Sequence, residues 1–151
     1  LDEIDSDWRD YQGLIVAGTH TPHDVEEIIE KIREARESGR PFLGVCFGHQ
    51  LAAIEYARNI LGIKDATSQE FYPENVLEPK DCIVVKRKDG LKVGLHDGES
   101  WWNNYEVVAG FDSIWQKSIN FITTQYHPEY QSSKDKPHPI LVKFLELCKQ
   151  R

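Results

Sequence analysis

The segment Pro41–Gln50, PFLGVCFGHQ, is the most informative part of this sequence. It begins as a short apolar strand and continues after Cys46 as a helical pattern, which places a sharp strand-to-helix turn at the cysteine. Such a turn forces its central residue into a strained backbone conformation and needs small neighbours, which Gly44 and Gly48 provide. The sequence therefore predicts a turn that presents the Cys46 thiol at the start of a helix.

This position has the features of a thiol nucleophile. The positive end of the following helix favours a thiolate over a thiol, so we expect a lowered pKa for Cys46. The backbone amide of Phe47 is expected to point to the place where a tetrahedral intermediate carries its negative oxygen. If this motif is considered alone, Cys46 can equally be interpreted as an inert buried cysteine.

A second motif, QYHPEY at 125–130, supplies the groups that a thiol nucleophile needs. Pro128 is expected to hold His127 in an extended conformation, in which residues two positions apart share a face, so the Glu129 carboxylate can reach the imidazole. We therefore predict a catalytic triad of Cys46, His127 and Glu129. The alternative for the second motif alone is a surface turn.

Strand and helix patterns alternate around these motifs. The sequence predicts strands at 13–18, 42–46 and 120–126, and helices at 21–39, 49–61 and 139–150. A strand at 81–85 is expected to turn at Lys88–Leu91 into a second short strand, as a hairpin. This order predicts an α/β fold with a mostly parallel sheet, flanking helices and a small antiparallel addition.

The bulk properties restrict the class of protein. A chain of 151 residues with 40% hydrophobic content can bury one core, so we expect a single domain. The net charge of −7 argues against nucleic acid or an anionic membrane as a partner. Without a run of about 18 apolar residues or a signal-peptide pattern, a cytoplasmic location is predicted. The three cysteines are too scattered to predict a disulfide framework.

These motifs resemble the class I, triad-type glutamine amidotransferases, and most closely the glutaminase domains of CTP synthases. The likeness also includes the stretches 51–62 and 65–71 and extends over about residues 11 to 150. It implies a doubly wound, flavodoxin-like fold, here lacking the family's usual first strand and helix, in one amidotransferase domain at 1–151 that is incomplete at its N-terminus.

The resemblance implies a reaction and its partners. Ammonia is expected to be released from the side-chain amide of glutamine through a γ-glutamyl thioester, without a cofactor. No G-x-x-x-x-G-K-[ST] phosphate loop occurs in the chain, so a synthetase (amidoligase) domain or subunit is the expected user of the ammonia.

The resemblance also assigns residues around the substrate. Gly18 corresponds to the family glycine whose amide completes the oxyanion hole with that of Phe47. Gln50 and Glu70 correspond to a glutamine and a glutamate that bind the substrate, at positions that suit contact with its ammonium group. Tyr105 is likewise expected in the substrate-binding site.

The chain departs from the family at Ser100–Val108, SWWNNYEVV, where CTP synthases carry an arginine- and histidine-rich segment. The arginine expected to bind the substrate carboxylate is missing. Two alternatives therefore stay open, namely a hydrolase of γ-glutamyl amides or peptides and a catalytically silent regulatory module. The segment His20–Asp24 contains residue types that bind metals, but a helix cap at Thr21 and Pro22 explains it better, and no metal site is expected.

Overall fold

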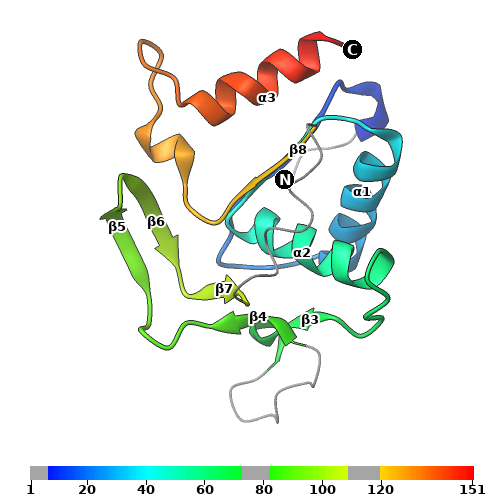
Figure 1. The fold of residues 1–151 in the computed structure, drawn as a ribbon, viewed down its shortest axis with the longest axis vertical. Helices are drawn as coiled ribbons and strands as arrows, with labels where there is room; N and C mark the ends of the chain where they lie inside the picture. Colours follow the sequence, from blue (N-terminus) through cyan, green and yellow to red (C-terminus); the bar gives the residue numbers. More distant parts are fainter. Residues whose placement is uncertain (1–6, 73–81, 109–119) are drawn as a thin grey trace.

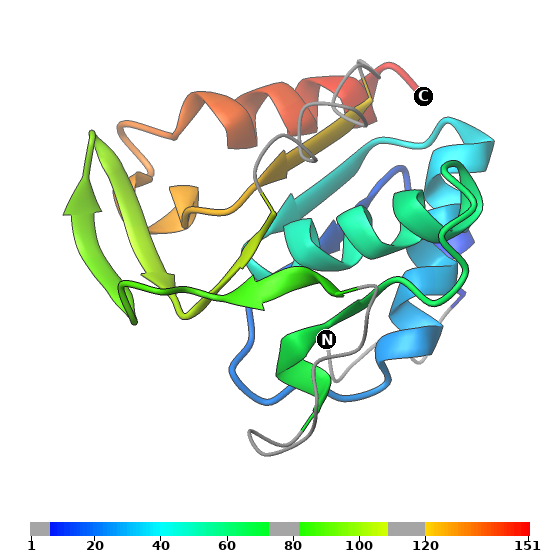
Figure 2. The same ribbon diagram turned by 60° about the horizontal axis from the view of Figure 1, so that its bottom comes forward.

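The computed structural model describes residues 7–72, 82–108 and 120–151. Its centre is a parallel sheet of order β1-β2-β8, made of β1 (Leu14–Val16), β2 (Phe42–Val45) and β8 (Phe121–Thr124). The helices α1 (Val25–Ser38) and α2 (Phe47–Asn59) lie on one face of this sheet, and α3 (Pro139–Lys149) lies on the other (Figure 1, Figure 2). The predicted doubly wound α/β fold is confirmed.

The central strand β2 shows why the fold has two helical layers. Successive residues of a strand point to opposite faces of the sheet. Phe42 packs in the hydrophobic cluster that contains α1 and α2, whereas Leu43 and Val45 pack against Phe144 of α3. Every residue of β2 is buried, which explains why its sequence is apolar without alternation.

The remaining strands form two small sheets. β3 (Thr67–Ser68) runs parallel to β4 (Cys82–Lys86), which pairs antiparallel with β7 (Tyr105–Val107). The strands β5 (Lys92–His96) and β6 (Glu99–Asn103) form a separate antiparallel pair that projects from the body of the molecule (Figure 1, Figure 2). The predicted antiparallel addition is confirmed.

The predicted position of the hairpin is wrong. The segment Lys88–Leu91 does join two strands, but β4 and β5 lie in different sheets. The hairpin is instead β5–β6, closed by Asp97 and Gly98 with φ angles of 53° and 80°. Asp-Gly between two strand-like runs is a strong hairpin signal, because both residues tolerate positive φ. Asp81, the first residue of the predicted strand, lies outside the described residues.

The predicted helix at 21–39 begins later than expected. Its first helical residue is Val25, and its N-cap is Asp24 with a φ of 50°. The backbone amide of Thr21 donates to the hydroxyl of Thr19 at 3.1 Å, so Thr21 belongs to a preceding turn and not to the cap.

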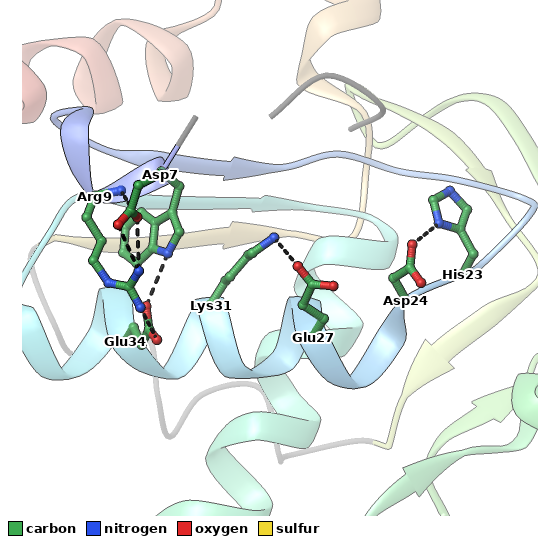
Figure 3. Close-up of polar contacts among 8 residues, drawn as sticks. Asp7, Arg9, His23, Asp24, Glu27, Lys31 and Glu34 are labelled. Carbon is green, nitrogen blue, oxygen red and sulfur yellow. Dashed lines mark hydrogen bonds and ion pairs between the residues drawn. The ribbon is translucent and has the colours of Figure 1, made fainter. Parts of the chain in front are cut away.

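Three 3₁₀ helices complete the described structure: η1 (Trp8–Asp10), η2 (Gln69–Phe71) and η4 (Pro128–Gln131). Two side chains of η1 contact Glu34 of α1. Trp8 Nε1 donates to Glu34 Oε2 at 3.1 Å. An Arg9 guanidinium nitrogen lies 2.6 Å from Glu34 Oε1 (Figure 3). Among the described residues, no helix combines the length and the apolar character needed to span a bilayer.

Candidate active site

Cys46 lies at the turn between β2 and α2, in the strained conformation that the sequence predicts. Its φ and ψ are 53° and −101°, and α2 begins at the next residue, two positions earlier than predicted. The flanking glycines are required by close packing. A Cβ atom at Gly48 would lie 2.1 Å from the carbonyl oxygen of Val16, and one at Gly44 would lie 2.8 Å from the carbonyl group of Gly48.

The carboxyl ends of the three parallel strands bring the two sequence motifs together. Val45 of β2 is level with Thr124 of β8, and the amide of Cys46 donates to the Thr124 carbonyl at 2.7 Å. A Cβ atom on Gly18, beyond the end of β1, would lie 3.3 Å from Cys46 Cβ and 2.8 Å from His127 Cε1. Gly18 therefore adjoins both the thiol residue and the imidazole.

The imidazole of His127 is held from two directions. Its Nδ1 lies 2.6 Å from Glu129 Oε1, and its ring stacks on Tyr130 with 4.8 Å between centroids. The expected contact with Glu129 is present, but its expected cause is wrong, because Glu129 lies in the first turn of η4 and not in an extended segment. Nε2, on the side of Gly18, is buried and has no hydrogen-bond partner among the described residues.

The expected lowering of the Cys46 pKa is wrong. The residue is only 6% exposed, and this burial raises the thiol pKa to about 12. The carboxylates of Glu70 and Glu129 contribute to this raised pKa, while the Phe47 amide and the Gln125 side chain act against it. Desolvation therefore outweighs the helix terminus, and Cys46 is a neutral thiol at pH 7.

Among the described residues, the sulfur of Cys46 contacts a backbone carbonyl that can accept a hydrogen bond and a side-chain amide that can donate one. The acceptor is the carbonyl oxygen of Trp102 in β6, at 3.8 Å, and the donor is Gln125 Nε2, at 3.6 Å. The adjoining cavity measures about 20 Å³, which is room for about one water molecule.

The residues predicted to bind the substrate line this cavity. Gln50, Glu70 and Tyr105 surround it together with Cys46 and Phe47. Burial raises the pKa of Glu70. The site thus gathers the predicted nucleophile and the predicted substrate contacts around one small space.

Two side-chain amides in the lining are oriented by a single backbone carbonyl. Gln50 Nε2 and Asn103 Nδ2 donate to the carbonyl oxygen of Tyr105 at 3.1 and 2.8 Å. Both bonds are made by the NH₂ groups, so the side-chain oxygens of Gln50 and Asn103 are not used in them. Asn103 Oδ1 is buried without a partner among the described residues. These acceptors, with the Glu70 carboxylate, match the donors of a substrate ammonium group.

The missing arginine has no replacement by lysine or arginine among the described residues that line the cavity. The basic side chain that lines it is His20, whose ring lies edge-on to Trp102 with 6.0 Å between centroids. His23 instead pairs with Asp24 at 2.9 Å (Figure 3). The described residues contain no group of three or more histidine, cysteine, aspartate or glutamate side chains suited to a metal ion.

Sequence reasoning missed two residues beside the motifs. The Ser100 hydroxyl on β6 donates to the His127 carbonyl, and the backbone carbonyl of Ser100 accepts from the His127 amide at 2.6 Å. No local pattern pairs these distant residues. Gln125 contacts the sulfur directly. It directly follows a predicted parallel strand, as Cys46 does, and this shared position at the strand ends could have identified it.

Comparisons with known proteins extend this picture. The family model "Glutamine amidotransferase class-I" matches residues 1–147. The CTP synthase of Methanoculleus marisnigri is 34% identical over 186 aligned positions, covering 95% of this chain and 35% of that protein. The CTP synthase of Encephalitozoon cuniculi is 31% identical, covering 96% of this chain and 35% of that protein. The chain thus spans about a third of the length of these relatives.

A solved structure, the glutaminase domain of Trypanosoma brucei CTPS with bound acivicin, superposes with a TM-score of 0.75 over 93% of this chain and 72% of that one. At 22% identity, this likeness supports the fold alone. The family model and the curated relatives together supply the assignment: the chain belongs to the class I glutamine amidotransferase family, and within it is similar to the glutaminase domain of CTP synthases.

Proposed function

We propose that this chain is a cysteine-dependent glutaminase that releases ammonia from the side-chain amide of glutamine. The observation that carries the proposal is that Cys46 and His127 both adjoin Gly18, with Glu129 at Nδ1 of His127, beside a cavity lined by hydrogen-bond acceptors. The family assignment supports glutamine hydrolysis over the two alternatives, a γ-glutamyl peptide hydrolase and a silent regulatory module.

The first half of the reaction forms a thioester. Because the thiol pKa is about 12, His127 Nε2 must take the proton as the sulfur attacks the amide carbon. Glu129 stabilises the resulting imidazolium, and the amides of Phe47 and Gly18 hold the oxyanion. The carbon–nitrogen bond then breaks, and the imidazolium returns the proton to the departing nitrogen, which leaves as ammonia.

The second half regenerates the thiol. Water, deprotonated by His127, attacks the γ-glutamyl thioester, and the carbon–sulfur bond breaks to give glutamate and the Cys46 thiolate, which recovers a proton from His127. The net reaction consumes glutamine and water and yields glutamate and ammonia.

Substrate recognition in this proposal relies on the ammonium end of glutamine. Glu70 supplies a carboxylate, and the side-chain oxygens of Gln50 and Asn103 supply two neutral acceptors. The relatives are named CTP synthases and are about three times as long as this chain, so we propose that a synthetase domain or subunit consumes the ammonia.

The direct test is ammonia release from glutamine by the purified protein, alone and with its synthetase partner. Cys46→Ala should reduce the rate to background, because the covalent intermediate then cannot form. Cys148→Ala is the matched control, since that thiol lies on α3, and it should retain activity. Glutamine hydrolysis that survives Cys46→Ala, or its absence from the unmodified protein in both settings, would refute the proposal.

A further inference from the structure

We propose that the side-chain amide of Gln125 is a catalytic group of this site, which donates a hydrogen bond to the Cys46 sulfur and stabilises the attacking thiolate. The inference rests on the proposed role of Cys46 as the nucleophile. It adds a residue for which the sequence motif alone suggested no task.

Strand register places Gln125 beside the sulfur. Val45 and Thr124 are partners at the ends of two parallel strands, so the residues that follow them, Cys46 and Gln125, are neighbours. The backbone bond from Cys46 to Thr124 holds this alignment at 2.7 Å. Gln125 Nε2 lies 3.6 Å from the sulfur, within hydrogen-bonding distance for a sulfur acceptor.

The hydrogen-bond network determines which end of the Gln125 amide faces the sulfur. The Tyr105 carbonyl can only accept, so the group of Gln50 that lies 3.1 Å from it must be the NH₂. The same Gln50 NH₂ lies 3.3 Å from the Gln125 amide, which must therefore turn its oxygen toward Gln50. The remaining end, the Gln125 NH₂, points to Cys46.

The donor and the acceptor at the sulfur have opposite effects on its ionisation. The Trp102 carbonyl accepts from the thiol and repels a thiolate, so it stabilises the neutral form. The Gln125 NH₂ donates, and its bond strengthens when the sulfur becomes negative. Gln125 is therefore the side chain that offsets part of the cost of burying a charge at Cys46.

Other titratable groups of the described residues also lie near the sulfur, and Tyr105 lines the same cavity. Glu70 on η2 and Glu129 on η4 oppose thiolate formation, and His127 is the proposed proton acceptor. His20 lines the same cavity from the loop that follows β1. These groups remain in place when Gln125 alone is replaced, so a change in thiol reactivity reports on the Gln125 contact.

The test measures thiolate formation without using glutamine. Purified protein is treated with iodoacetamide between pH 7.5 and 10, and alkylation of the Cys46 peptide is followed by mass spectrometry, with the Cys82 and Cys148 peptides as internal standards. Gln125→Glu keeps the side-chain volume but replaces the donor by a carboxylate. We expect Cys46 to react at least about tenfold more slowly in this variant at each pH, the effect of losing one hydrogen bond to a charged group.

A second variant and a control complete the design. Gln125→Ala removes the donor without adding charge and should also slow alkylation of Cys46, by less than Gln125→Glu does. Gln150→Ala, at the exposed end of α3, should leave the rate unchanged. Both Gln125 variants are first shown to be folded by circular dichroism.

The results separate the two proposals. Alkylation of Cys46 at the unmodified rate in both folded Gln125 variants would overturn the role of Gln125, even if the protein hydrolyses glutamine. Slower alkylation in a protein that does not hydrolyse glutamine would leave the contact with the thiolate standing and refute the proposed function instead.

Discussion

At the scale of single residues, two opposing effects set the pKa of the Cys46 thiol: burial raises it, and the helix terminus lowers it. A charge near the first turn of a helix gains about 0.3–1 kcal/mol, whereas burying an ionised group without a counter-charge costs several times more. The 6% exposure of Cys46 makes burial the dominant effect. In the proposed reaction, the thiolate is therefore formed during catalysis and is not the resting state.

This balance predicts a loss of stability at alkaline pH. Burial raises the Cys46 pKa from 9.0 to about 12, so between these values the unfolded chain releases a proton that the folded chain retains. The stability due to the protonated thiol is complete below pH 9 and disappears as the pH approaches 12, with a slope of up to about 1.4 kcal/mol per pH unit.

The measurement is the free energy of unfolding from urea titrations at several pH values above 8.5. The Cys46→Ala variant is the reference, because every other titratable group is common to both proteins. The unmodified protein should lose stability faster than the variant as the pH rises. Parallel curves for the two proteins would show that burial does not control this thiol.

At the scale of secondary-structure elements, the β5–β6 hairpin lies against the candidate site. Its inner strand contacts both motifs, through the Trp102 carbonyl at Cys46 and through Ser100 at the backbone of His127. Its outer strand β5 is largely exposed. The cavity of about 20 Å³ is too small for a glutamine side chain, so the proposed reaction requires its lining to open, and β6 contributes Trp102 and Asn103 to that lining.

The two adjacent tryptophans of β6 provide a matched pair of variants. Trp102 lines the cavity, whereas the Trp101 ring lies 6.3 Å from the Tyr126 ring and beneath the Lys92 ammonium. Trp102→Ala should increase the rate at which a bulky maleimide labels Cys46 several-fold, because it removes part of the cover. Trp101→Ala should change this rate less. Equal rates in both variants would contradict the assignment of Trp102 as the cover.

At the scale of the whole molecule, a buried ion pair joins the two helices that cover one face of the sheet. The Glu55 carboxylate of α2 is fully buried and receives Arg36 of α1 at 2.7 to 3.1 Å. The pKa of Arg36 is raised, chiefly by its hydrogen bonds to Glu55. Because α2 begins at the nucleophile turn, this pair also contributes to the placement of the site.

Arg36→Ala should destabilise the protein by about 3–5 kcal/mol, because it leaves the Glu55 charge buried and unpaired. Arg33→Ala, on the same helix, removes only exposed pairs with Glu30 and Glu37 and should cost about 1 kcal/mol or less. Thermal or urea unfolding measures both effects. Similar losses of unfolding free energy in the two variants would show that the buried ion pair contributes no more to stability than the exposed pairs do.

The fold could be predicted because its signals are local. The apolar run at β2 and the helical spacing of Ile28, Ile32 and Ala35 reflect burial of whole elements, and these residues are buried as expected. The hairpin was misplaced because strand pairing depends on partners that are distant in sequence. The helix start at Val25 was missed because the competing bond from Thr21 to Thr19 is a detail of one loop.

The amino-acid sequence alone indicates the parallel α/β architecture and the association of a Cys-containing turn with a His-Pro-Glu motif, because these depend on periodicity and on residue chemistry. The protonation state of Cys46, the covering of its sulfur by β6 and the contact with Gln125 become visible only in the folded chain. These properties depend on burial and on strand register, and both arise only when segments far apart in the chain pack together.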